Sequence, residues 1–161
     1  MAKSQTLLND IDGRCNCLAA RQASRYLTAV YDQALSPVEL RVTQFSILHK
    51  LMKSGPMAIG ELANKMAMDR TTLSSNLKPL ERDGLIDVVP GEDRRAKKTV
   101  ITKAGLIRYR KALPLWAAVQ TKFEGTYGKR PAAELRNALR AVLSSGFEPW
   151  AENGPAVTAG S

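Results

Sequence analysis

Residues 59–86 read IGELANKMAMDRTTLSSNLKPLERDGLI, and this stretch decides the fold. Its apolar residues first recur at helical spacing, which predicts a short helix over residues 59–67. Asp69 can cap a second helix over residues 69–82, and Gly84 is suited to end it. Two short helices joined by a turn of about three residues form a helix-turn-helix arrangement.

The apolar pattern changes its period after Gly84. Residues 85–89 and 98–102 are rich in β-branched residues, which predicts two strands. Residues 90–97 between them combine Pro and Gly with charged side chains. The sequence therefore predicts a β-hairpin with an exposed, charged tip directly after the helix-turn-helix.

Helical patterns return on both sides of this unit. Upstream they predict a helix over residues 15–35 and a second helix capped by Thr43, with apolar stripes on two sides. Downstream they predict a long helix over residues 103–124 with a kink at Pro114, a loop over residues 125–130, and a last helix with Pro131 in its first turn.

The composition favours a polyanionic partner. The 161 residues include 24 Lys and Arg against 15 Asp and Glu, a formal net charge of +9. Nucleic acid and anionic membrane surfaces both attract such a chain. Polar and charged residues interrupt the N-terminal stretch early, so we expect no signal peptide and no transmembrane span. We therefore expect a cytoplasmic protein that does not contact a membrane.

The predicted second helix has a face that suits contact with DNA. When its leucines Leu73, Leu77 and Leu80 point inward, the opposite face carries hydroxyls and cations, with no acidic residue before Glu81. Such side chains can approach base edges and phosphates, although an ordinary solvated helix face is the alternative. The candidate residues are Arg70, Thr71, Thr72, Ser74, Ser75, Lys78 and Arg82.

The hairpin tip concentrates positive charge. Four cations (Arg94, Arg95, Lys97 and Lys98) crowd onto five positions, opposed only by Glu92 and Asp93. An exposed hairpin that projects Arg suits the minor groove, where negative potential concentrates. The same run of charge standing alone would be typical of a solvated loop, and its place after a helix-turn-helix favours a DNA contact.

The two cysteines, Cys15 and Cys17, stand alone in the chain. Two thiols cannot supply the four ligands of a structural zinc site, and no other metal or cofactor motif is present. Side chains two residues apart on a helix point about 200° apart, which disfavours a bridge between them. Two free thiols are expected, with a redox-sensing or intersubunit role as the alternative.

The stretch from Leu40 to Gly105 resembles the MarR family of bacterial regulators. The strings TQFSILHKL, IGELANKMAMDRTTLSSNLKPLERDGLI and DRRAKKTVITKAG match the family's second helix, helix-turn-helix and wing in order and spacing. The family's D-x-R wing signature falls on Asp93 and Arg95. The wing's exit motif is represented by Ile101, Thr102 and Gly105.

This resemblance implies a fold and a set of regions. The expected fold is mainly α, a winged helix-turn-helix with a small β-hairpin wing and with N- and C-terminal dimerisation helices. Residues 1–40 and 103–150 would form the dimerisation part and residues 41–102 the DNA-binding lobe. Residues 151–161, which lack charge after Glu152, are expected to form a disordered tail. The wing contacts would come from Asp93, Arg94, Arg95 and Lys97.

Family members often bind phenols or other small anionic aromatics where the lobe meets the dimerisation helices. Candidate lining residues here are Tyr31, Phe45, His49 and Tyr109. Core packing is the alternative role for each of these residues, and a satisfied core histidine is commoner than a ligand-binding one.

The expected function is that of a homodimeric regulator, a repressor that binds a pseudo-palindromic operator in double-stranded DNA and is released by a small effector. An enzyme is disfavoured because the chain has one His and neither a nucleophile motif nor a phosphate-binding loop. The alternative is a nucleoid-type or RNA-binding protein without sequence specificity. RNA modules present stacking aromatics, which the candidate face lacks.

Overall fold

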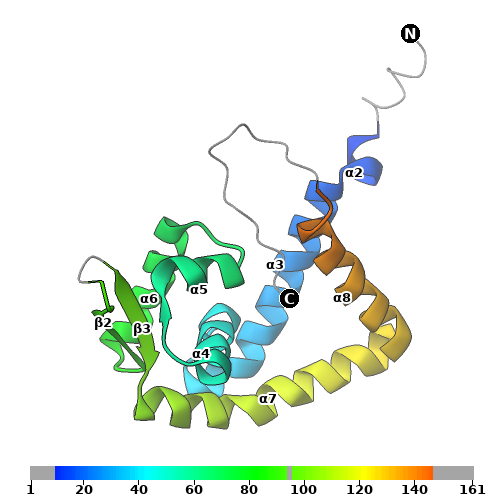
Figure 1. The fold of residues 1–161 in the computed structure, drawn as a ribbon. Helices are drawn as coiled ribbons and strands as arrows, with labels where there is room; N and C mark the ends of the chain where they lie inside the picture. Colours follow the sequence, from blue (N-terminus) through cyan, green and yellow to red (C-terminus); the bar gives the residue numbers. More distant parts are fainter. Residues whose placement is uncertain (1–9, 94–95, 147–161) are drawn as a thin grey trace.

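The computed structural model describes residues 10–93 and 96–146. It is mainly helical, with one small sheet at an end of the molecule (Figure 1). The helices are α2 (Ile11–Arg14), α3 (Asn16–Leu35), α4 (Val42–Ser54), α5 (Ile59–Lys65), α6 (Arg70–Arg82), α7 (Lys103–Tyr127) and α8 (Lys129–Leu143), and a 3-10 turn η1 (Ser36–Val38) joins α3 to α4. The strands are β1 (Met57–Ala58), β2 (Ile86–Pro90) and β3 (Lys97–Ile101). The expected winged helix-turn-helix is confirmed.

The sheet has three antiparallel strands in the order β1-β3-β2. In the predicted hairpin, Ile86 pairs with Ile101 and Pro90 pairs with Lys97. The third strand, β1, was not predicted, because two residues are too few to display an alternating pattern. It pairs Met57 with Thr99 and so ties the turn before α5 to the hairpin.

Helix α4 lies at the centre of the core. Phe45, Ile47, Leu48 and Leu51 are all buried, as the two apolar stripes predict, whereas Met52 at the end of one stripe is 39% exposed. The helix-turn-helix packs against it through the inward faces of α5 and α6. Their buried residues are Leu62, Ala63, Leu73, Leu77 and Leu80.

The start of α4 differs from the prediction. Thr43 is not the cap, because the helix begins at Val42 with Arg41 as its N-cap residue. The physical reason lies outside the local sequence. The carboxylate of Asp32 on α3 accepts the backbone N–H of Val42 at 2.7 Å, and Gln44 accepts that of Arg41 at 2.8 Å. A side chain from another helix thus satisfies an amide for which a local cap was expected.

The exit from the hairpin into α7 is fixed by a short polar network. The hydroxyl of Thr102 donates to the carbonyl of Gly84 at 2.7 Å and accepts the N–H of Gly105 at 3.0 Å. A Cβ on Gly105 would lie 2.0 Å from the carbonyl oxygen of Leu85. Glycine is required there because the helix and strand backbones approach so closely.

Helices α7 and α8 meet at one residue. The predicted loop over residues 125–130 is wrong, because α7 continues to Tyr127 and α8 starts at Lys129. Gly128 alone makes the turn, with a φ of 104° that favours glycine. Figure 1 shows α7 running from the sheet to this corner, where α8 turns back toward the first turns of α3.

A polar network joins the three long helices. The Tyr31 hydroxyl of α3 donates to the Gln120 side-chain oxygen of α7, whose amide donates to Glu124 at 2.8 Å. Arg136 of α8 donates to the same Glu124 oxygen at 2.8 Å. These hydrogen bonds from Gln120 and Arg136 lower the pKa of Glu124, so the carboxylate stays charged.

Candidate nucleic-acid interface

The outward face of α6 is built as its sequence predicts. Leu73, Leu77 and Leu80 are buried, at 0, 3 and 0% exposure, and fix the rotation of the helix. The residues on the opposite face are exposed: Thr71, Ser75, Lys78 and Arg82. Thr72 is also exposed, whereas Ser74 is half-buried. The structure therefore presents hydroxyls and cations to solvent along one side of a thirteen-residue helix.

Asp69 caps α6 as predicted. Its carboxylate accepts the Thr72 backbone N–H at 2.8 Å and the Thr72 hydroxyl at 2.6 Å. These two hydrogen bonds lower the pKa of Asp69. Thr72 therefore serves the helix cap, and its hydroxyl can only accept a further hydrogen bond.

The other residues on the outward face of α6 differ in whether their side chains already form a hydrogen bond or an ion pair. The Ser75 hydroxyl donates to the Thr71 carbonyl at 3.1 Å, and Arg82 pairs with Asp83 at 2.9 Å. This neighbour raises the pKa of the Arg82 guanidinium and offsets its charge. Lys78 forms none of the ion pairs found in residues 10–93 and 96–146. Lys78 is thus the cation of this face that has no ion-pair partner among the described residues.

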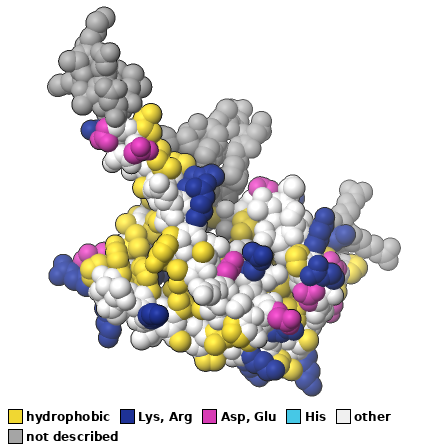
Figure 2. All heavy atoms as spheres, turned by 180° about the vertical axis from the view of Figure 1, so that it is seen from behind, with side chains coloured by type: hydrophobic (Ala, Val, Ile, Leu, Met, Phe, Trp, Pro, Cys, Tyr) yellow, Lys and Arg dark blue, Asp and Glu magenta, His cyan; other side chains and the backbone are white. Residues whose placement is uncertain are grey.

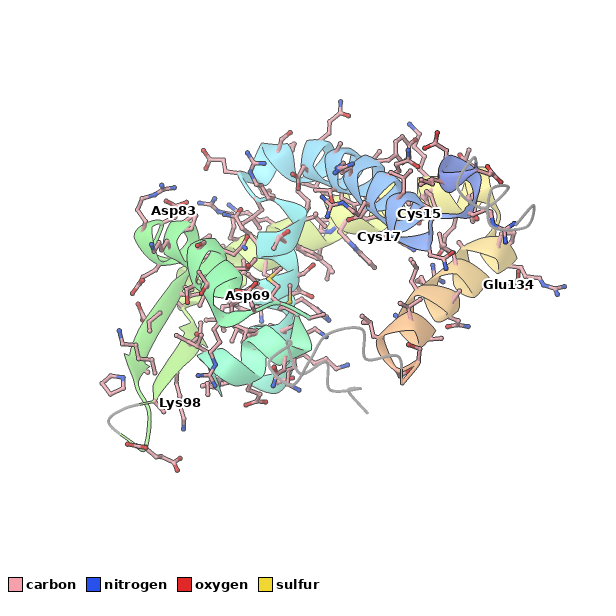
Figure 3. All side chains as sticks on the ribbon, turned by 90° about the horizontal axis from the view of Figure 1, so that it is seen from above. Cys15, Cys17, Asp69, Asp83, Lys98 and Glu134 are labelled. Carbon is pink, nitrogen blue, oxygen red and sulfur yellow. The ribbon has the colours of Figure 1, made fainter. Side chains whose placement is uncertain are left out.

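The wing projects beside α6, and Figure 3 places Lys98 on it, well away from Asp83 at the end of α6. Lys97 and Asp93 are exposed, and Lys98 pairs with Glu92 at 3.2 Å. The tip is closed by the Ala96 N–H, which donates to the Asp93 carbonyl at 2.8 Å. The predicted contacts Arg94 and Arg95 lie outside the described residues.

A polar cleft of about 790 Å³ adjoins the outward face of α6. Ser75 and Arg82 line it from one side, and Arg41 lines it from the start of α4. The Arg41 side chain is 80% exposed. Sequence reasoning missed Arg41 and the cleft residue Asn76, since nothing local signals that Arg41, far away in the chain, lies beside α6.

A second, smaller cavity of about 250 Å³ lies between α4 and α7. Its lining includes three of the four predicted effector-pocket residues, Phe45, His49 and Tyr109, together with Ser46, Lys50, Leu113 and Trp116. Phe45 stacks on Tyr109 with ring centroids 5.3 Å apart. The fourth predicted residue, Tyr31, does not line it and instead contacts Gln120.

The imidazole in this cavity is poised to be neutral. His49 Nδ1 lies 2.8 Å from the Tyr109 hydroxyl. Burial lowers the pKa of His49, and the charges of Lys50 and Lys53 lower it further. Burial also raises the pKa of the Tyr109 phenol. The lining of the cavity combines aromatic side chains with one cation, Lys50.

The cysteines lie far from the wing, as Figure 3 shows. Cys15 is not within a helix: it has extended backbone angles and is the N-cap of α3, where its sulfur accepts the Leu18 N–H at 3.3 Å. The expectation that both thiols lie on one helix is therefore wrong. Cys17 is exposed in the first turn, and both thiols are free.

Residues 10–93 and 96–146 contain neither a metal-binding cluster nor a membrane-spanning helix. No three His, Cys, Asp or Glu side chains there are grouped so as to hold a metal ion. No helix within these residues has the length and apolar character needed to span a membrane.

Comparisons with known proteins agree with this architecture. The model of the MarR family matches residues 40–97. Among curated proteins, the HTH-type transcriptional regulator YwoH of Bacillus subtilis is 31% identical over 88 residues, which cover 55% of this chain and 64% of YwoH. The transcriptional activatory protein BadR of Rhodopseudomonas palustris is also 31% identical over 88 residues, covering 52% of this chain and 50% of BadR. The chain thus spans half to two thirds of these curated relatives.

A solved structure matches over a greater length. The transcriptional regulator MosR of M. tuberculosis, in a crystal structure with DNA, is 36% identical, with a TM-score of 0.73. The match covers 83% of this chain and all of the MosR chain. The helix-turn-helix, the wing and the flanking helices therefore fall within one shared fold, and the chain belongs to the MarR family of transcriptional regulators.

Proposed function

We propose that the protein binds a specific pseudo-palindromic operator in double-stranded DNA as a homodimer and represses transcription until a small aromatic effector releases it. The observation that carries this proposal is the outward face of α6, which exposes Thr71, Ser75, Lys78 and Arg82 beside a basic wing. The crystallised MosR complex, in which a 36% identical regulator is bound to DNA, supports the same use of the fold.

In the proposed complex, α6 lies in the major groove and the wing reaches the adjacent minor groove. Short hydroxyls on α6 allow close approach to base edges, and Lys78 neutralises a phosphate. Residues 41–102 thus act as the DNA-binding lobe. DNA binding in a bacterial cell also implies action in the cytoplasm.

The homodimer is supported by apolar side chains that the single chain leaves uncovered. Figure 2 shows hydrophobic side chains gathered on the side of the molecule where α7 and α8 lie. Leu139 is 44% exposed and Val142 is 67% exposed on α8, and Tyr26 is 67% exposed on α3. A second copy of this chain would cover such a surface, and a closed two-fold dimer matches a pseudo-palindromic operator.

The effector proposal rests on the smaller cavity. Stacked Phe45 and Tyr109 suit a flat aromatic ring, while the Lys50 ammonium suits a carboxylate or phenolate. The cavity lies between α4, at the centre of the lobe, and α7, which leads to α8. A ligand bound there would change the angle between the DNA-binding lobe and the helices that we propose to dimerise.

The test of DNA binding compares four probes at two salt concentrations: the promoter region next to the protein's own gene, a random duplex, single-stranded RNA and single-stranded DNA. We expect the promoter duplex to bind with at least about 10³-fold preference over the random duplex. Sedimentation should give a dimer at micromolar concentration. Equal affinity for all four probes would instead support the alternative of a nucleic-acid-binding protein without sequence specificity.

The direction of regulation is tested by transcription from the same promoter. A repressor lowers transcript yield, and we expect this outcome. The relative BadR is named an activatory protein, so increased yield on addition of the protein would correct this part of the proposal while leaving DNA binding intact.

The effector is tested with a panel of benzoates and neutral phenols, followed through the fluorescence of Trp116 in the cavity wall and through release of promoter duplex. Lys50→Ala should weaken the binding of benzoates more than the binding of neutral phenols, because it removes the cation. Lys53→Ala is the matched control, since Lys53 belongs to the same helix and does not line the cavity. If both variants weaken the binding of benzoates equally, Lys50 does not contact the effector.

A further inference from the structure

The guanidinium of Arg70 lies against Gly60, in the first turn of α5. A Cβ built on Gly60 would lie 2.8 Å from Arg70 Nη2 and 3.2 Å from both Cζ and Nε. These are the three nearest atoms to that position, and all belong to one planar group. The seat for the guanidinium exists because residue 60 has no side chain.

The backbone itself does not require glycine at this position. Gly60 is the second residue of α5 and is absent from the glycines with positive φ, which are Gly55, Gly84, Gly128 and Gly146 among the described residues. An alanine would fit the helical backbone and has a higher helix propensity than glycine. The group that alanine would displace is the Arg70 side chain, whose flexible end can move without disturbing the fold.

Arg70 is well placed to bind an anion. It is exposed, and it forms none of the ion pairs found in the described part of the chain. Leu77 follows it by seven positions, or about two helical turns, so the Cβ of Arg70 leaves α6 on the face of the buried Leu77 and not on the outward face of Ser75 and Lys78. Its charge therefore sits where the two helices of the helix-turn-helix meet.

We propose that Gly60 is a positioning residue that lets the Arg70 guanidinium lie against α5, where it contacts a phosphate of the duplex and not a base edge. The proposal rests on the proposed DNA binding. A guanidinium presents a rigid planar fork that matches two phosphate oxygens, so its orientation matters more than its charge alone. A lysine ammonium has no such plane and would gain nothing from the glycine seat.

The test is a double-mutant cycle on promoter duplex and on random duplex. Arg70→Ala should weaken both by roughly tenfold, as expected for one charged hydrogen-bonded contact. It should also make the slope of log affinity against log salt shallower by about 0.9. Gly60→Ala should cause a smaller loss of the same kind, with an unchanged ratio between the two duplexes.

The coupling between the two positions decides the proposal. Gly60→Ala should cause no further loss in an Arg70→Ala or an Arg70→Lys background, because neither variant has a planar group to seat. Gly125→Ala is the matched control: this α7 glycine has nothing within 4 Å of its Cβ position, and binding should not change. Thermal unfolding of each variant reports any structural loss.

Two results would overturn the positioning role. The first is that Gly60→Ala binds duplex with wild-type affinity although Arg70→Ala binds weakly. The second is that Gly60→Ala still lowers the affinity in a protein that already carries Arg70→Ala. A changed preference between duplexes in Arg70→Ala would assign a base contact and overturn the phosphate assignment. If the wild-type protein binds no duplex, the proposed DNA binding fails together with this inference. If the wild-type protein binds duplex and either of the two results above is found, only the role of Gly60 fails.

Discussion

The Asp32 carboxylate of α3 accepts the backbone N–H of Val42, the first residue of α4, at 2.7 Å. One helix thereby caps another, and the same carboxylate lies 3.6 Å from the Arg41 guanidinium. We expect Asp32→Ala to lower the free energy of unfolding by about 1–2 kcal/mol, as for the loss of a helix cap. Asp32→Asn keeps an acceptor oxygen and should lose less. Urea unfolding followed by circular dichroism measures both, and equal losses would mean that the ion pair matters more than the cap.

Replacing Thr99, on the central strand β3, should stabilise the fold. Its side chain is fully buried, and its hydroxyl finds no hydrogen-bond partner among the described residues. Thr99→Val removes this unsatisfied group at nearly constant volume and should raise the free energy of unfolding by about 1 kcal/mol. Thr102→Val is the contrasting variant, because it breaks the contacts with Gly84 and Gly105 and should destabilise by about 1–2 kcal/mol. Destabilisation by Thr99→Val would indicate a hidden partner for its hydroxyl.

The lowered pKa of His49 predicts a loss of stability in mild acid. Burial and the charges of Lys50 and Lys53 make the folded protein bind this proton less readily than the unfolded chain does. As the pH falls through about 6.5, the unfolded chain takes up the proton first, so the free energy of unfolding falls. His49→Gln should flatten this dependence between about pH 7.5 and pH 5.5 in urea midpoints at constant protein concentration. An unchanged slope would place the titrating group elsewhere.

The recognition helix and the wing should fail in different ways. Ser75→Ala should change which sequences are preferred, because a good base contact discriminates by roughly 1–3 kcal/mol. Arg95→Ala should weaken operator and random DNA together and make the salt slope shallower by about 0.9. The D-x-R signature of the resembled family implies that Asp93 steadies the wing arginine Arg95, so Asp93→Ala should weaken binding although it removes a negative charge. Binding titrations with both duplexes check all three variants, and tighter binding by Asp93→Ala would contradict the assigned wing.

The hydrogen bond of Cys15 predicts different effects for two substitutions. Its sulfur accepts the Leu18 N–H at the start of α3, so Cys15→Ala should destabilise by about 1 kcal/mol, whereas Cys15→Ser keeps an acceptor and should not. The serine pair Cys15→Ser and Cys17→Ser then isolates thiol chemistry from helix stability. Equal duplex binding by wild type and this pair after peroxide treatment supports free thiols. Loss of binding in the wild type alone would support a redox role.

The sequence predicts what depends on local pattern and misses what depends on distant contacts. Leucine spacing and the Asp69 cap locate α6 and its outward face because both signals lie within one helix. The α4 cap was assigned to Thr43 because the true acceptor, Asp32, belongs to another helix. The link between Tyr31 and Gln120 is missed for the same reason. Strand β1 is missed because its two residues are too few to display an alternating pattern. In the candidate site, Arg41 and Gly60 were missed because their proximity to α6 comes from tertiary packing.

The continuity of α7 gives the molecule a lever arm. Only Thr102 separates its 25 residues from the wing strand β3, and they finish at the single-residue corner of Gly128. At 1.5 Å per residue the arm is about 37 Å long. A rotation of about 5° at the corner would therefore carry the far end through about 3 Å, half the roughly 6 Å width of a minor groove. Small changes in the packing of α8 are thus magnified where the wing begins.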